Sequence, residues 1–240
     1  MKNMLVIDTS SPRSVLALKT KASFIDRSEN RKGTHSRDIL CRLQNIVLEA
    51  GLDLSELDCI IFGCGPGSYT GIRITAGVVQ GLSYGLDIPV VSVSSLEATA
   101  YSFVEENFLS IKEGDRILAS ILARPDEYFV GGYEWKNDFV EPIFKEKLVR
   151  AGDLFTLPKG VWFGIGDTSK FRDSIKSITG VETKAFIVKQ HYSASSVFKI
   201  GQNKIGEGKF LEPASAIPKY LKEVIKLIFS FFQKAFFLIF

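Results

Sequence analysis

The chain has 240 residues, 45% of them hydrophobic, which is enough to bury a substantial core in one domain or in two small lobes. Its formal net charge of +3 is only mildly basic and does not indicate a dedicated nucleic-acid binder. The cysteines Cys41, Cys59 and Cys64 have no metal-ligand spacing, and an odd number cannot all pair, so they favour a reduced, cytoplasmic protein. The apolar run at residues 4–7 is too short for a signal peptide.

The first part of the chain alternates apolar strand patterns with helical ones. The segment 59–65, "CIIFGCG", is apolar throughout, as in a strand buried on both faces. The expected elements are strands at 4–8, 14–19 and 22–25, a polar loop at 26–37, a helix from Ser36 to a stop at Gly51, strand 59–65, a helix over 70–85, strand 89–93, and a helix capped by Ser94 or Ser95.

The second part repeats this alternation less cleanly, with strands expected at 116–122, 127–135 and 161–165 and a helix at 193–205. Strands and helices joined by short connections predict an α/β fold whose sheets are covered on their faces. We expect an N-terminal lobe at 1–105, a smaller C-terminal lobe at 106–215 and an apolar helical tail at 216–240. The aromatic stretch Val224–Phe240 barely reaches the length of a spanning helix, so we expect it docked on the body, on a partner or on a membrane surface.

A glycine-rich loop joins strand 59–65 to the helix that follows. Such a loop presents backbone N–H groups at a helix N-terminus, which is a ready anion site. The loop lacks the Lys-Ser/Thr pair of a Walker A motif, and strand 89–93 ends without the acidic residue of a dinucleotide fingerprint. Asp8 could hold a hydrated Mg²⁺, or it could accept N–H groups of its own turn. The candidate nucleotide or phosphate contacts are Asp8, Thr9, Ser10, Gly65, Gly67 and Ser68.

Three further glycines, Gly77, Gly81 and Gly85, lie four residues apart inside the helix, and Arg73 continues the same row. An interior helical glycine costs roughly 0.8–1.0 kcal/mol relative to alanine, so a row of them needs a reason. Close approach of another backbone is the obvious one. Packing on the chain's own sheet and docking of a partner helix explain the row equally well.

Several motifs together resemble the TsaB (YeaZ) family: "IDTS" (7–10), "HS" (35–36), "GPGSYTGIR" (65–73), "SVSSLEA" (92–98) and "IPKYLK" (217–222). The resemblance implies an α/β, actin/Hsp70-like (ASKHA) two-lobed fold with mixed sheets flanked by helices. It also implies a partner subunit in the synthesis of threonylcarbamoyladenosine next to the anticodon of tRNA. In that pathway the paralogous TsaD carries the transfer chemistry, TsaE supplies an ATPase, and tRNA is met through the complex.

The resemblance further implies a pseudoenzyme with no catalytic residue, metal or cofactor of its own. Catalytic relatives carry two histidines four residues apart on a helix, but here His35 is followed by Ile39. ATP is expected only weakly bound or at the junction with the partner. The expected partner interface is His35, Arg73, Gly77, Gly81 and Gly85, with a homodimer as the alternative in isolation.

Two other functions compete with this one. A free-standing enzyme of the same fold would be a small-molecule kinase or a peptidase, but neither a second phosphate motif nor a G-x-S-x-G elbow is present. An RNA-binding module would rest on the cationic residues Arg27, Arg31, Lys32, Arg37 and Arg42, which lack interleaved aromatic residues.

Overall fold

The computed structural model describes residues 1–30, 38–107, 110–150, 153, 156–166, 172, 175–176, 179–181, 183–189 and 192–221. Its first sheet has the order β3-β2-β1-β5-β6, with β4 paired to β2. The strands are β1 (Met4–Asp8), β2 (Arg13–Lys19), β3 (Phe24–Asp26), β4 (Glu29–Asn30), β5 (Cys59–Gly65) and β6 (Val90–Ser94). β1, β2 and β3 are antiparallel, whereas β1, β5 and β6 are parallel, so the sheet is mixed.

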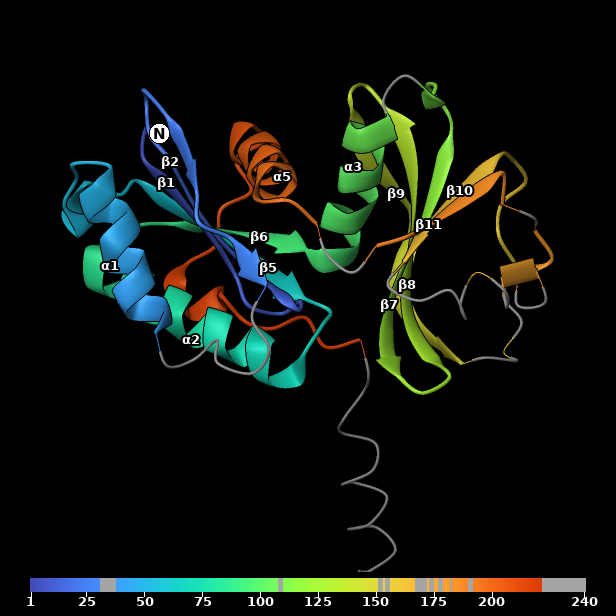
Figure 1. Cartoon of the computed structure of the whole chain (residues 1–240), viewed down its shortest axis with the longest axis horizontal. Coiled ribbons are helices and arrows are strands. Elements are labelled where there is room, and N and C mark those ends of the chain that lie inside the picture. The colour runs from blue at the N-terminus through green and yellow to red at the C-terminus, as the bar shows by residue number, and fades with distance from the viewer. Residues whose placement is uncertain are drawn as a thin grey trace, which may run out of the picture.

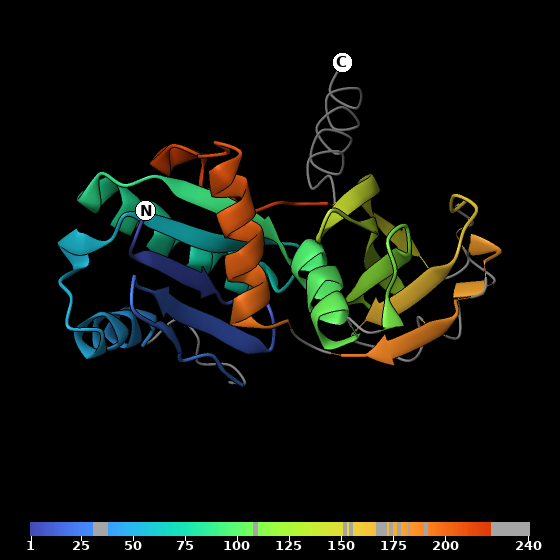
Figure 2. The ribbon, with the colours of Figure 1, turned by 90° about the horizontal axis from the view of Figure 1, so that it is seen from above.

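Helices cover both faces of this sheet. Figure 1 shows α1 (Ile39–Glu49) and α2 (Tyr69–Leu86) on one face and α5 (Ala194–Gly206) on the other, and Figure 2 shows α5 crossing the strands. Because side chains alternate along a strand, Leu5 and Ile7 join the core under α1 and α2, while Met4 and Val6 join the core under α5.

The second sheet has the order β11-β10-β7-β8-β9 and is also mixed. Its strands are β7 (Arg116–Arg124), β8 (Glu127–Lys136), β9 (Phe139–Arg150), β10 (Trp162–Gly166) and β11 (Ala185–Val188). The helix α3 (Ser95–Asn107) stands between the two sheets (Figure 1). Two short 3₁₀ turns, Leu54–Glu56 and Pro213–Ser215, complete the described elements.

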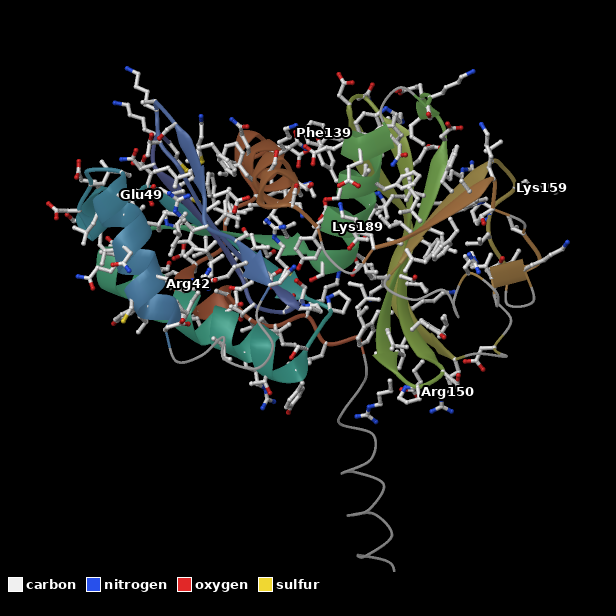
Figure 3. All side chains as sticks on the ribbon, in the orientation of Figure 1. Arg42, Glu49, Phe139, Arg150, Lys159 and Lys189 are labelled. Atoms are coloured by element: carbon white, nitrogen blue, oxygen red, sulfur yellow. The ribbon has the colours of Figure 1, made fainter. Side chains whose placement is uncertain are left out.

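The structure contains every strand and helix expected above that falls within the described residues, with ends shifted by a few positions. Sequence analysis missed β11 and the short β4, which lies in the segment expected to be a loop at 26–37. It also missed β9, which carries Pro142 and several charged residues and so lacks regular alternation. β9 is an edge strand, where a proline without an N–H is tolerated. It runs the length of the sheet, from Phe139 beside α3 to Arg150 at the far end (Figure 3).

The chain returns to the first sheet after β11. α5 packs on the face of β6, β5 and β1, whereas sequence analysis expects its residues within the C-terminal lobe at 106–215. One apolar core, which includes Val197 of α5, Phe103 of α3 and Ile117 of β7, joins the two sheets. The lobe boundaries themselves remain a prediction, and the tail Val224–Phe240 lies outside the described residues.

Candidate functional site

The segment Asp8-Thr9-Ser10 ends β1 and is buried against the start of α2, with none of the three residues more than 3% exposed. The backbone N–H of Thr9 donates to Thr75 Oγ1 at 2.9 Å, and its hydroxyl donates to Gly71 O at 2.8 Å. These bonds hold the end of β1 in van der Waals contact with the first turns of the helix.

Small residues make that approach geometrically feasible. A Cβ on Gly71 would lie 2.0 Å from Thr9 O, and one on Gly67 would lie 2.5 Å from Ser10 O. Gly63, which sequence analysis did not single out, leaves space for the Asp8 carboxylate, because a Cβ on Gly63 would lie 1.6 Å from Asp8 Oδ2. Gly65 has a φ of 94°, a left-handed conformation that favours glycine. Gly65, Gly67 and Gly71 therefore shape the turn from strand to helix, and Gly63 makes room for Asp8.

The amides of the glycine loop are partly used by the chain itself. Ser68 N donates to Ser10 O at 2.8 Å, and the Ser68 side chain caps α2 by accepting from Gly71 N at 3.3 Å. The structure thus brings all six predicted phosphate contacts into one place, and their contact with a ligand remains a prediction.

Asp8 is enclosed by hydroxyl groups. Its Oδ1 accepts from Ser10 N at 2.6 Å, and its Oδ2 accepts from the phenol of Tyr192. The Tyr192 oxygen also lies 3.3 Å from Ser10 Oγ and 3.2 Å from Ser95 Oγ. Burial raises the pKa of Asp8, and the hydrogen bonds from Tyr192 and Ser10 oppose the rise. Burial, and then the nearby Asp8 charge, raise the pKa of Tyr192.

Sequence reasoning missed Tyr192 because it precedes α5, far along the chain from Asp8, and belongs to no motif. Its position follows from the return of α5 to the first sheet. Among the described residues, no group of three or more His, Cys, Asp or Glu side chains could hold a metal ion. His35 and His191 lie outside the described residues.

A second candidate surface lies on the outer face of α2. Tyr69, Arg73, Gly77, Gly81 and Gly85 follow one another at intervals of four residues, and all five are exposed. We call Gly77, Gly81 and Gly85 the glycine face. A Cβ at any of the three would meet nothing within 4 Å, so the interpretation that this row packs on the chain's own sheet is wrong. Its role as a partner interface, together with His35, is not decided by this geometry.

The basic cluster suggested for RNA contact is partly neutralised within the chain. Arg27 pairs with Glu49, and Arg42 pairs with Glu29 at 2.8 Å while also donating to Arg27 O at 2.7 Å. Figure 3 marks Arg42 and Glu49 on α1. Arg31, Lys32 and Arg37 lie outside the described residues. Across the part of the chain that is described, no helix is both long and apolar enough to span a bilayer.

Comparison with known proteins places the chain in a family. A family model described as "TsaD: tRNA N6-adenosine threonylcarbamoyltransferase" matches residues 29–192. The tRNA threonylcarbamoyladenosine biosynthesis protein TsaB of Bacillus subtilis is 30% identical over 190 residues, 77% of this chain and 79% of that protein. The chain belongs to the TsaB (YeaZ) family.

Other members of the TsaB family agree with this assignment. The Escherichia coli TsaB is 27% identical over 225 residues, 91% of this chain and 94% of its own. The Haemophilus influenzae TsaB is 35% identical over 126 residues, a match that spans only 51% of that relative. The solved structure of YeaZ from Pseudomonas aeruginosa superposes with a TM-score of 0.81 at 28% identity, over 92% of this chain and 100% of that one. The α/β, actin/Hsp70-like fold with two mixed sheets flanked by helices is thereby confirmed.

Proposed function

We propose that the chain is a non-catalytic scaffold subunit in the threonylcarbamoylation of the adenosine next to the anticodon in tRNA, acting with a TsaD-type paralogue and a TsaE-type ATPase. The names of the TsaB relatives and the match to a TsaD family model support the pathway. The open glycine face of α2 is the observation that carries the scaffold role, since a surface glycine row costs helix stability without filling the chain's own core.

The state of Asp8 supports a role without independent ATP chemistry. Both carboxylate oxygens already accept hydrogen bonds from the chain, one from Ser10 N and one from Tyr192. A carboxylate that is engaged in this way would have to exchange the Tyr192 hydroxyl for a metal-bound water before it took part in hydrolysis. ATP, where it matters to this subunit, is therefore proposed to bind weakly or at the junction with the TsaD-type partner.

The competing enzyme function would need an activated group in the same region. Cys64 lies beside the glycine loop, but burial raises the pKa of its thiol to about 12, and the thiolate is the reactive form. A cysteine-dependent peptidase at this position is therefore disfavoured. A small-molecule kinase remains the alternative that the turnover measurement below addresses.

Reconstitution tests the proposed function. The chain is purified, mixed with the TsaD-type and TsaE-type proteins of the same organism, and assayed for modified adenosine in tRNA with each component omitted in turn. We expect modification to require this chain, and the chain alone to neither modify tRNA nor hydrolyse ATP. ATP turnover by the isolated chain above about 1 s⁻¹, within the ordinary enzyme range, would overturn the scaffold role.

A further inference from the structure

Arg73 is held between two aromatic rings at one end of the glycine face. Its guanidinium carbon lies 3.9 Å from the ring centroid of Tyr69 and 5.9 Å from that of Tyr220. Its Nε donates to the Tyr220 hydroxyl at 2.9 Å. One arginine face is thus stacked and one donor is used, which fixes the direction of the guanidinium fork.

The second aromatic ring comes from the segment after α5, and that segment is itself anchored. The backbone N–H of Lys219 donates to Cys64 O at 2.8 Å, and its ammonium group pairs with Glu146 Oε2 at 2.9 Å. The Glu146 side chain is only 8% exposed and accepts from Ser94 Oγ and Tyr133 OH at 2.5 and 2.6 Å. Lys219, the neighbour of Tyr220 in the chain, therefore contacts both sheets, and Tyr220 in turn accepts the hydrogen bond from Arg73.

The guanidinium of Arg73 has no ion-pair partner among the described residues. Arg73 is the one charged residue in α2, and none of the ion pairs found in the described part of the chain includes it. Arg73 is exposed, and its one side-chain hydrogen bond found among the described residues uses Nε and not the Nη groups. A planar guanidinium with its fork free is suited to binding a carboxylate through two parallel hydrogen bonds.

We propose that Tyr69, Arg73 and Tyr220 form a carboxylate receptor that takes an aspartate or glutamate side chain from the docking helix of the partner subunit. This inference rests on the proposed function, since it names the chemistry of the partner at the same surface. Arg73 and Gly81 are about 12 Å apart along the α2 axis at 1.5 Å per residue. In a partner helix lying along this face, the acidic residue bound to Arg73 would be about two turns from the residue packed on Gly81. The receptor would thereby set the register of the partner helix against α2.

Charge decides between a partner and a second copy of this chain as the occupant. The α2 helix of a second copy would bring another Arg73 and no acid, because the sequence of α2 contains none. A partner helix with an acidic residue is complementary to the receptor, so we commit to that occupant.

The test measures the affinity of the TsaD-type subunit for the wild-type chain and for the variants Arg73→Gln, Arg73→Lys and Tyr220→Phe at low and high salt. Arg124→Gln removes the same charge from an exposed site on β7 and is the matched control. We expect Arg73→Gln to weaken binding at least about tenfold and to flatten its salt dependence. Lysine, which lacks the fork, and the Tyr220 variant should give intermediate losses, whereas Arg124→Gln should bind like the wild type.

The outcomes that overturn the receptor are separate from those that overturn the proposed function. If Arg73→Gln binds the TsaD-type subunit as tightly as the wild-type chain does, the receptor is refuted and the scaffold role stands. A change in self-association of Arg73→Gln, by light scattering, with unchanged partner binding refutes the choice of occupant. Wild-type chain that does not bind the TsaD-type subunit at all refutes the proposed function itself. Melting temperature is recorded for each variant, and a loss of binding that tracks a loss of folding also refutes the receptor.

Discussion

Replacing Gly81 with leucine separates helix stability from partner binding. The position is exposed and a Cβ there meets nothing within 4 Å, so the added side chain creates no clash in the isolated chain. Leucine is a good helix former, and the substitution should stabilise the fold by roughly 0.8 kcal/mol. For a chain of this length, that gain corresponds to a rise in Tm of about 2–3 °C. In the complex the same side chain would occupy the space proposed for a partner helix, and overpacking of about 1–3 kcal/mol should weaken binding about tenfold or more.

The assay pairs thermal melting of the isolated chain with a binding measurement against the TsaD-type subunit. Gly71→Ala on the same helix is the opposite case, because its Cβ would lie 2.0 Å from Thr9 O and backbone atoms would have to move. It should lower the stability of the fold by about 1–3 kcal/mol. Gly206→Ala, at the exposed end of α5 with nothing within 4 Å, should be harmless to both folding and binding.

Two results would refute this reasoning in different ways. A lowered Tm for Gly81→Leu would mean that the row is packed in the folded chain after all. A raised Tm with unchanged affinity would mean that the glycine face is open but not the docking surface, and the interface would then lie elsewhere on the chain.

The remaining predictions concern buried groups and the tail. Tyr192→Phe removes the donor to a buried carboxylate and should cost about 1–3 kcal/mol of stability, measured by urea unfolding. The pKa of Asp8 is raised above its ordinary value of 3.8, so the folded chain favours the protonated carboxyl. The stability that this proton contributes is complete below pH 3.8 and is lost as the pH rises through the raised pKa. The wild type should therefore lose stability relative to Asp8→Asn over that range, and parallel pH profiles would contradict this. Ellman's reagent should modify exposed Cys41 in the native chain, and the buried Cys59 and Cys64, whose pKa values are about 12, only after unfolding. Deleting residues 224–240 should change light scattering or lipid flotation, because exposed aromatic and aliphatic side chains associate; identical behaviour would contradict a docked tail.

The local elements were predictable because hydrophobic period and turn chemistry act over a few residues. The continuous apolar run at 59–65 identified a strand buried on both faces, and Gly51 marked the end of α1, where it adopts a φ of 69°. β9 was not predictable in the same way, because Pro142 and the charges of an edge strand obscure the alternation.

The sequence by itself determined which residues share a face of α2 and which glycines stand in the turn, since both follow from spacing along one segment. Only the tertiary structure decided what those faces meet. Spacing could not reveal that a Cβ on Gly71 would clash with Thr9 while one on Gly81 would meet nothing within 4 Å. Nor could it reveal that Tyr192 closes over Asp8 or that Tyr220 orders Arg73, because those contacts join segments more than a hundred residues apart. Such pairs form only when α5 and the segment after it return to the first sheet, and that return is set by the packing of the whole core.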